Sequence, residues 1–288
     1  MPVSAREALP PFDRMTASTG PALALDDVTC RFAGRDGASA YTAVANTTLH
    51  VAAGEFVSVV GPTGCGKSTL LNVAAGLLAP SSGIVSVHGE RLVAADGVNA
   101  RAGYMFQAEA LMPWRTALDN VTAGLSFRGV PREAAREQGE AWLRRVGLAG
   151  FGDRYPHQMS GGMRKRAALA QTLILSPDIL LMDEPFSALD VQTRQMMENE
   201  LLALWAEDRK SVLFITHDLE EAIALSDRVI VLSAGPATHP IGDFRIDLPR
   251  PRDVAEIRMT PGFVDLHREI WNTMRDEVLK AYAAQKVA

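Results

Sequence analysis

Several classes of protein are excluded by what this sequence has little of. Only two of its 288 residues are cysteines, Cys30 and Cys65, which cannot form a disulfide framework and fit a reducing compartment such as the cytosol. No apolar run approaches the roughly 18 residues of a membrane span, so a membrane role must come through a partner. Glycine and proline, 23 and 16 residues, are too few for a collagen-like or low-complexity chain.

An excess of charge of one sign is also lacking. Lys and Arg number 29 against 34 Asp and Glu, and the resulting net charge of −5 does not favour a nucleic-acid-binding protein. Residues 1–22 lack the apolar core of a secretory signal and are expected to be a flexible leader. From Pro236 onward acidic and basic residues balance, which is typical of a solvated surface.

Short apolar segments alternate with helical patterns through the middle of the chain. Phe56–Val60 and Ile179–Met182 are nearly continuous apolar sequence, as expected of buried strands. The alternation predicts an α/β fold with a mostly parallel sheet. Further strands are expected at Leu23–Phe32, Thr48–Val51, Glu55–Val60, Ile84–His88, Ser211–Thr216 and Arg228–Leu232, and helices at Ser68–Leu78, Leu118–Arg145, Val191–Trp205 and after Thr260-Pro261.

A glycine-rich loop lies between a predicted strand and a predicted helix. Residues 61–68 fit the pattern G-x-x-x-x-G-K-[ST], in which backbone N–H groups and the helix N-terminus surround phosphate oxygens. Lys67 is expected to pair with the β- and γ-phosphates of ATP, and the Ser68 hydroxyl with Mg²⁺. The predicted phosphate-binding residues are Gly61, Pro62, Thr63, Gly64, Cys65, Gly66, Lys67, Ser68 and Thr69. The Cys65 side chain is not required, because backbone amides bind the phosphate.

Two carboxylates end the second buried strand. Asp183 and Glu184 follow Ile179–Met182, and the carboxyl end of such a strand lies beside the phosphate loop. We expect Asp183 to hold the hydrated Mg²⁺ and Glu184 to deprotonate a water that attacks the γ-phosphate.

A Ser-Gly-Gly turn distinguishes this chain from other proteins with those two motifs. Ser160, Gly161 and Gly162 precede a predicted helix, 23 residues before Asp183, and form a second candidate anion site. At this point the chain resembles the ABC ATPases, whose signature is Leu-Ser-Gly-Gly-Gln. This sequence has Met159 and Met163 at the first and last positions.

The resemblance, which covers about Leu23 to Ser233, implies roles for further residues. Gln107 looks like the glutamine that contacts Mg²⁺ and the attacking water, and His217 like the switch histidine that reaches the γ-phosphate. Asp190 closes a Ser-Ala-Leu-Asp segment similar to the family's dimer-crossing loop. Phe32 matches the aromatic residue that stacks on adenine, and Tyr41 is the rival candidate.

Finer matches point to one subfamily. Residues 107–116, Leu118–Val121 and Asp247–Asp253 look like ATPases of nitrate, sulfonate and taurine importers. The resemblance implies a homodimer, transmembrane permease subunits and, indirectly, a solute-binding protein, with no nucleic acid. It implies a peripheral location on the cytoplasmic face of the cell membrane. Trp114 is a candidate for permease contact, with a core position as the alternative.

The resemblance also implies an architecture. We expect a P-loop ATPase core with an antiparallel β subdomain, the ABC ATPase domain spanning 23–235 with a helical subdomain at about 108–165, and a C-terminal extension at 236–288. Two alternatives remain, a soluble ABC-type ATPase and a non-hydrolysing ATP-binding regulator. The first lacks support because the chain has neither heptad repeats nor a second set of motifs. Glu184 and His217 argue against the second.

Overall fold

The computed structural model describes residues 20–33, 40–92, 99 and 101–285, in two compact units. We call residues 109–176 the helical unit, and the described residues of 20–108 and 177–288 the sheet unit. The predicted leader lies outside the described residues except for its last three positions. In the described part of the chain, no helix is long and apolar enough to cross a membrane.

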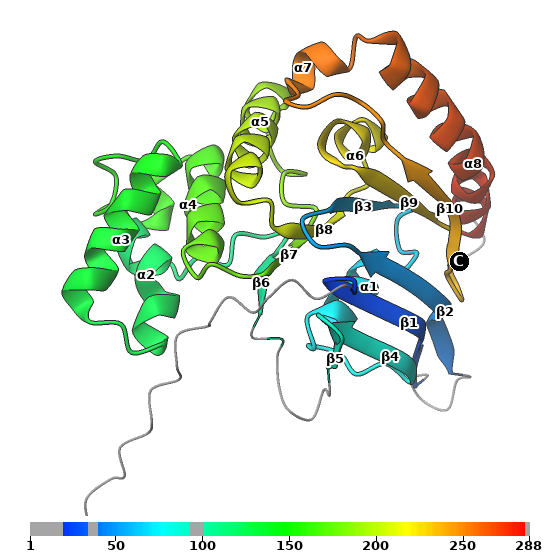
Figure 1. Ribbon diagram of the computed structural model, residues 1–288, viewed down its shortest axis with the longest axis horizontal. Helices are drawn as coiled ribbons and strands as arrows, with labels where there is room; N and C mark the ends of the chain where they lie inside the picture. The colour runs from blue at the N-terminus through cyan, green and yellow to red at the C-terminus, as the bar shows by residue number, and fades with distance from the viewer. Residues whose placement is uncertain (1–19, 34–39, 93–98, 100, 286–288) are drawn as a thin grey trace, which may run out of the picture. The chain divides into compact units, whose positions relative to one another are not determined.

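A six-stranded sheet forms the centre of the sheet unit, in the order β10-β9-β3-β8-β7-β6 (Figure 1). All neighbouring strands run parallel except β10, which pairs antiparallel with β9. The strands are β3 Phe56–Val60, β6 Ala102–Met105, β7 Ile179–Asp183, β8 Ser211–Ile215, β9 Arg228–Leu232 and β10 Pro240–Arg245. Every residue of β3 and β8 is buried, which confirms the expectation of covered central strands.

Helices α5 (Val191–Asp208) and α6 (Leu219–Leu225) cover one face of this sheet (Figure 1). Phe56 of β3 meets Trp205 of α5 edge to face, with ring centroids 5.9 Å apart. Ser58, two residues on, hydrogen-bonds Ser226 at the end of α6. Alternate strand positions point to opposite faces, so Val57 and Val59 pack on the other side of the sheet.

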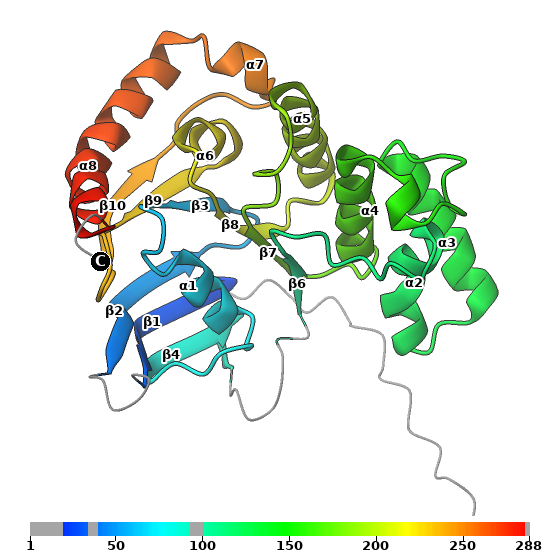
Figure 2. The ribbon, with the colours of Figure 1, turned by 180° about the vertical axis from the view of Figure 1, so that it is seen from behind.

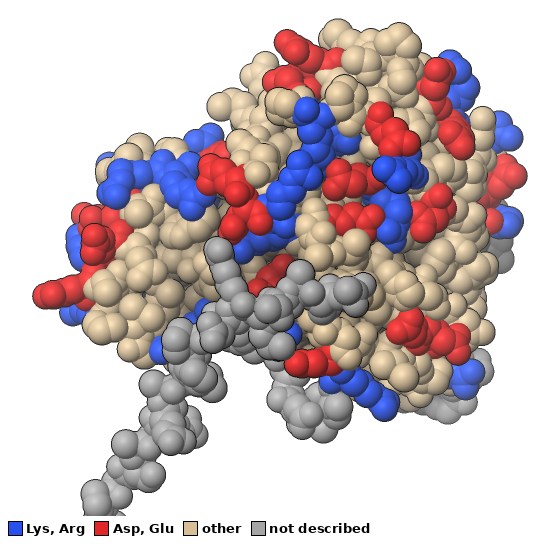
Figure 3. Space-filling view, in the orientation of Figure 1, with Lys and Arg blue, Asp and Glu red and all other residues tan. Residues whose placement is uncertain are grey.

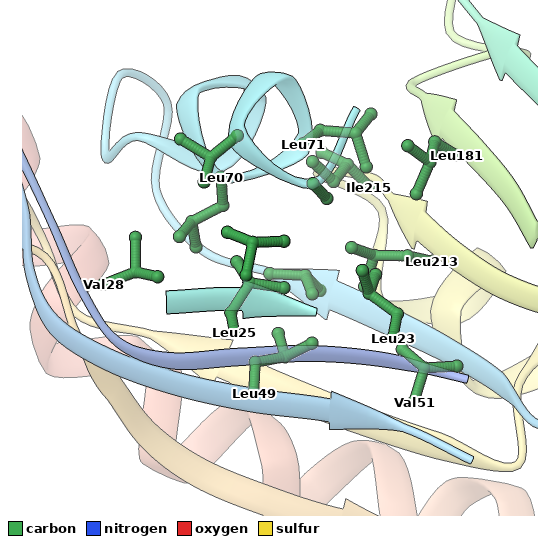
Figure 4. Packing of buried hydrophobic residues seen from close by; sticks show 14 of the residues in the cluster. Leu23, Leu25, Val28, Leu49, Val51, Leu70, Leu71, Leu181, Leu213 and Ile215 are labelled. Atoms are coloured by element: carbon green, nitrogen blue, oxygen red, sulfur yellow. The ribbon is translucent and has the colours of Figure 1, made fainter. Parts of the chain in front are cut away.

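That other side holds an antiparallel sheet and the first helix. The order is β2-β1-β4-β5, with β1 Leu23–Phe32, β2 Tyr41–Val51, β4 Ser82–Val87 and β5 Glu90–Arg91. Helix α1 (Lys67–Ala74) packs against strands of both sheets (Figure 2). Figure 4 shows its Leu70 and Leu71 in one buried cluster with Leu25 and Leu213. Burial of each leucine contributes about 1.5–3 kcal/mol, which fixes the helix that follows the glycine-rich loop.

The C-terminal segment packs on the sheet unit. After β10 come α7 (Val254–Ile257) and α8 (Pro261–Gln285). The buried guanidinium of Arg252 donates to five backbone carbonyls, two of them in the last turn of α6, and so joins this segment to that helix. On the right of the face in Figure 3, acidic and basic side chains lie beside one another, as the balanced charge of the segment predicts.

The helical unit contains α2 (Ala117–Phe127), α3 (Arg132–Arg145) and α4 (Gly161–Leu173), with a short 3₁₀ turn at Pro156–Gln158. The helical stretch predicted at Leu118–Arg145 is therefore two helices. The chain breaks at Gly129, whose φ is +75°, and Pro131. Helices α2 and α3 approach closely at Gly139, where an added Cβ would lie 2.4 Å from Thr122.

The predicted α/β class, with a mostly parallel sheet and a second antiparallel sheet, is confirmed. The helical unit runs from Glu109 to Ser176, and within it α4 packs on α2. The helical subdomain expected at about 108–165 stays a prediction. The C-terminal segment belongs to the sheet unit. The proposed division at residues 22 and 235 stays a prediction.

Candidate functional site

Four neighbouring parallel strands, β3, β8, β7 and β6, end at one edge of the central sheet. The glycine-rich loop follows β3, His217 follows β8, Asp183 and Glu184 end β7, and Gln107 follows β6. In open α/β sheets, ligands bind outside the carboxyl ends of the strands. The structure thus brings these residues together, although up to 156 positions separate Gly61 from His217 in the chain.

The glycine-rich loop needs its glycines for space and for backbone conformation. Gly66 has φ +105°, and a Cβ there would lie 3.0 Å from Val44 Cγ2. Gly64 has φ +78° and nothing within 4 Å of its Cβ position, so the loop is open on that side. A Cβ at Gly61 would meet Leu232 O and the Cys65 sulfur, each at 3.1 Å.

Lys67 is a buried cation that lacks a carboxylate partner among the described residues. Its ammonium donates to Gly61 O at 2.9 Å and to Pro62 O at 3.0 Å, both within the loop. Only 6% of the residue is exposed. A buried charge of this kind is stabilised by an anion, and the neighbouring helix N-terminus favours the same ligand.

The Cys65 thiol faces the protein interior. Its side chain belongs to the core cluster that α1 forms with both sheets. Burial raises the pKa of the thiol, against the lowering effect of the Lys67 charge. Only the Cys65 backbone can therefore face a ligand at this loop, and the thiol is not a reactive group.

Ser68 and Asp183 lie side by side at the start of α1. The Ser68 hydroxyl donates to Asp183 Oδ1 at 3.1 Å. Burial raises the pKa of Asp183, while the hydrogen bond from Ser68 acts in the opposite direction. Tyr104 of β6 also adjoins Asp183, and its hydroxyl donates to Asn72 Oδ1 at 3.1 Å. Tyr104 was not identified from the sequence, because a lone tyrosine in a strand gives no signal.

Glu184 is contacted by two of the other predicted residues. Gln107 Nε2 donates to Glu184 Oε2 at 3.2 Å, and His217 Nδ1 lies 3.0 Å from the same oxygen. Glu184 has φ +43°, and its backbone N–H donates to Ile215 O at the end of β8. This unusual conformation for a non-glycine residue turns the chain out of β7 directly at the carboxylate.

The two rival aromatic residues are cross-strand neighbours. Phe32 of β1 pairs with Tyr41 of β2, so both rings lie on the same face of the antiparallel sheet. Their exposed fractions are 40% and 47%. A Cβ placed at Gly235 would lie 3.5 Å from the Tyr41 hydroxyl and 3.6 Å from Gly64 O. Tyr41 therefore reaches the flank of the glycine-rich loop.

Two predicted residues begin helices. In the helical unit, Ser160 accepts from Met163 N at 3.3 Å and caps α4, whose first residues are Gly161 and Gly162. In the sheet unit, Asp190 accepts from Thr193 N at 3.0 Å and caps α5, and these hydrogen bonds lower its pKa.

Trp114 is 74% exposed, so it does not occupy a core position. The loop that carries it is held by Asn120 of α2, whose amide donates to Met112 O, Arg115 O and Thr116 O. Asn120 also accepts from Met112 N at 2.7 Å. A buried amide with these four bonds fixes the loop and presents the indole to the surface.

The residues present fit a magnesium nucleotide. Mg²⁺ in proteins is commonly bound through one or two carboxylates together with substrate phosphates and water. Ser68 and Asp183 supply adjoining oxygens, and the buried Lys67 requires an anion nearby. Bound Mg²⁺ would neutralise charge on the phosphates, and Gln107 is a third candidate ligand.

Comparisons with known proteins agree with this geometry. Residues 44–187 match the ABC transporter family. An uncharacterized ABC transporter ATP-binding protein of Methanocaldococcus jannaschii is 47% identical over 240 residues, which cover 83% of this chain and 86% of that protein. A taurine import ATP-binding protein of Pelagibacter ubique is 41% identical over 236 residues, covering 78% and 86%.

A solved structure shares the fold. The ATP-binding cassette MJ0796, described as a dimeric post-hydrolysis state bound to ADP and Pi, has a TM-score of 0.69 and 31% identity. The match covers 79% of this chain and 100% of that one. Together with the family match over half of the sequence, these similarities establish the relationship. The chain belongs to the ABC transporter family, as an ATP-binding ABC ATPase subunit.

Proposed function

We propose that this chain is the ATP-hydrolysing subunit of an ABC importer. The observation that carries the proposal is the Glu184 carboxylate, which both Gln107 and His217 contact beside the phosphate loop. Polar contacts from two residues fix the orientation of this carboxylate, as a general base requires. Two relatives named as taurine import proteins support the direction of transport.

The loop from Gly61 to Thr69 would hold the phosphates of ATP through its backbone N–H groups. Lys67 would exchange its carbonyl partners for phosphate oxygens, because an ammonium binds an anion more strongly than a neutral carbonyl. Ser68, Asp183 and Gln107 would hold Mg²⁺, and Phe32 or Tyr41 would stack on adenine.

Glu184 would act as general base on the attacking water. In this role the carboxylate must be ionised and aimed at the γ-phosphate, and Gln107 and His217 restrict its orientation. His217 is also half exposed, with 54% of its side chain accessible, so it can reach a bound γ-phosphate.

Two copies of the chain would share each ATP. Ser160, Gly161 and Gly162 begin a helix of the helical unit, and a helix N-terminus with free backbone N–H groups binds anions. In the proposed homodimer these residues, with Asp190, would cover ATP held by the other copy. The dimeric state of cassette MJ0796 supports this assembly.

The proposed role in an importer implies further partners. Transmembrane permease subunits would hold the ATPase at the cytoplasmic face of the membrane, and a solute-binding protein would deliver the solute. The exposed Trp114 is the proposed permease contact. The proposed solute class is taurine, another sulfonate, nitrate or a related small anion, on the strength of the taurine import relatives.

The enzymatic part is tested by Glu184→Gln, which keeps the shape and removes the proton acceptor. ATP hydrolysis is expected to fall by about 10²–10⁴-fold, the usual effect of a lost general base, while ATP affinity remains. Glu256→Gln on α7 is the control, an exposed glutamate away from the sheet edge. Loss of ATP affinity in Glu184→Gln would show that Glu184 binds nucleotide rather than activating water.

The transport part is tested by uptake. Cells that carry Glu184→Gln in place of the original chain are expected to lose uptake of radiolabelled taurine, an alkanesulfonate or nitrate. Normal uptake of all three by those cells would contradict the proposed solute class.

A further inference from the structure

Two buried glutamates lie behind the His217 segment. Glu221 of α6 is 4% exposed and Glu198 of α5 is fully buried. In each, Oε1 is buried and has no hydrogen-bond partner among the described residues. Buried carboxylates are normally paired, because an ionised group without a partner loses the free energy of its hydration and gains no compensating interaction. Hydrophobic packing therefore does not explain why these two carboxyl groups are buried, each with one oxygen unsatisfied.

The surrounding charges do not neutralise Glu221. Arg258 lies 3.3 Å from Glu198 and 3.8 Å from Glu220, and Arg194 lies 3.4 Å from Asp218. Two guanidinium groups thus face four carboxylates, and within the described part of the chain neither forms an ion pair with Glu221. Among the described residues, the charged groups that act on the pair are Arg194 on α5, Asp218 and Glu220 at the start of α6, and Arg258 after α7.

This environment favours the protonated acid. Burial raises the pKa of Glu221 to about 8, although the hydrogen bond from Thr216 acts in the opposite direction. The charge of Glu198 raises the pKa further. Burial also raises the pKa of Glu198, to about 7, in opposition to Arg258. Around neutral pH the pair therefore does not carry two full negative charges.

Glu221 is joined to the backbone on both sides of His217. The buried Thr216 hydroxyl donates to Glu221 Oε2 and accepts from Asp218 N at 3.0 Å. Asp218 in turn accepts from Glu220 N and Glu221 N and caps α6. The residues before and after His217 are thereby fixed to the first turn of α6, while the imidazole projects toward Glu184.

We propose that Glu221 is a positioning residue for His217, and that it acts through Thr216 as a neutral carboxylic acid. The inference rests on the proposed role of His217 at the γ-phosphate. Ionisation of Glu221 would add a buried negative charge beside Asp218 and Glu198. Repulsion among buried carboxylates would then loosen the turn that aims the histidine.

Kinetics of the purified full-length ATPase test this inference. Glu221→Ala removes the acceptor for Thr216 and is expected to lower kcat by about 10- to 100-fold, as misplacement of a catalytic group does, with the KM for ATP unchanged. Glu221→Gln retains a neutral side chain of the same shape and is expected to restore most of kcat at pH 7. Above pH 8, wild-type kcat should fall relative to that of Glu221→Gln.

A double-mutant cycle separates positioning from general stability. In a His217→Ala background, Glu221→Ala is expected to change kcat by less than about twofold, because the group that it positions is gone. A further loss equal to that in the wild-type background would overturn the inference. A loss of kcat in Glu221→Gln as large as in Glu221→Ala would also overturn it. Full activity of His217→Ala alone would contradict the proposed role of His217 and the inference together.

A second pair of variants covers the case in which Glu221→Ala does not fold. Thr216→Val keeps the volume and removes the hydroxyl, and should lower kcat, whereas Thr216→Ser should restore it. A readout independent of activity is the NMR shift of the Asp218 amide. It should titrate between pH 7 and pH 9 in the wild type and stay constant in Glu221→Gln. A titration that persists in Glu221→Gln would exclude Glu221 as its source.

Discussion

The Nδ1 atom of His217 lies 3.0 Å from Oε2 of Glu184 across the ends of two neighbouring parallel strands. The parallel pairing of β7 with β8, in which Asp183 is opposite Ile215, sets this separation. Glu184 follows β7 directly and His217 follows β8 after Thr216, so the register of the two strands brings the pair together. In the proposed function, the imidazole and the carboxylate act together on the attacking water and the γ-phosphate.

His217→Ala is expected to lower kcat for ATP hydrolysis by about 10²-fold, since Glu184 loses one of its two orienting contacts. The KM for ATP should change little, because the phosphate loop supplies most of the proposed contacts with the phosphates. The matched control is His50→Ala, which removes another histidine–carboxylate pair, 2.7 Å from Asp26 on the antiparallel sheet. Equal effects of the two variants would contradict a special role for His217.

The aromatic pair gives a prediction about nucleotide affinity. Phe32→Ala is expected to weaken ATP binding by about fivefold to a hundredfold, which corresponds to the ~1–3 kcal/mol of stacking a base on an aromatic ring. Tyr41→Ala should have a smaller effect, since Phe32 is the residue expected to stack on adenine. A larger effect of Tyr41→Ala would assign the stacking to Tyr41. Titration with a fluorescent ATP analogue measures both. Phe127→Ala in the helical unit, 80% exposed, is the control.

Sequence patterns located most of the site because its residues follow apolar strands directly. The loop after β3, the carboxylates at the end of β7 and His217 after β8 each adjoin a strand with a continuous apolar pattern. Strands β1 and β9 have the predicted bounds for the same reason. All but the first residue of β9 are buried, and β1 has two buried segments of three residues, so the hydrophobic pattern indicates both strands.

The hydrophobic pattern does not predict edge strands or contacts between side chains of different elements. Strand β10 begins with a proline and alternates polar with apolar residues at the sheet edge, so it lacks the pattern of a central strand. Helix α1 ends at Ala74 instead of Leu78, since the chain turns at Gly76, where φ is +71°. The contact of Tyr104 with Asp183 arises only when β6 pairs with β7, which is far from it in the sequence. Thr216 and Glu221 are close in the sequence, but no sequence pattern indicates their hydrogen bond.

The buried Glu221 predicts a pH dependence of stability. Its pKa in the folded chain, about 8, exceeds its ordinary value of 4.5, so folding takes up a proton between these values. Its contribution is fully present below pH 4.5 and is lost as the pH rises through 8. Thermal denaturation of Glu221→Gln should therefore show a Tm advantage over wild type that grows from pH 5 to pH 8.5. Glu140→Gln, at a half-exposed glutamate of α3 that is paired with Arg136, should show no such trend.

Mixed variants test most directly whether two copies of the chain share each ATP, as proposed above. On a Glu184→Gln background, which prevents hydrolysis, ATP should produce a stable dimer visible by size-exclusion chromatography. Ser160→Arg places a bulky charge at the N-terminus of α4, and Lys67→Ala removes the phosphate-binding ammonium. Neither double variant should dimerise alone. Their mixture should form an ATP-dependent heterodimer with one intact composite site. If the mixture stays monomeric while Glu184→Gln alone dimerises, the shared site is contradicted.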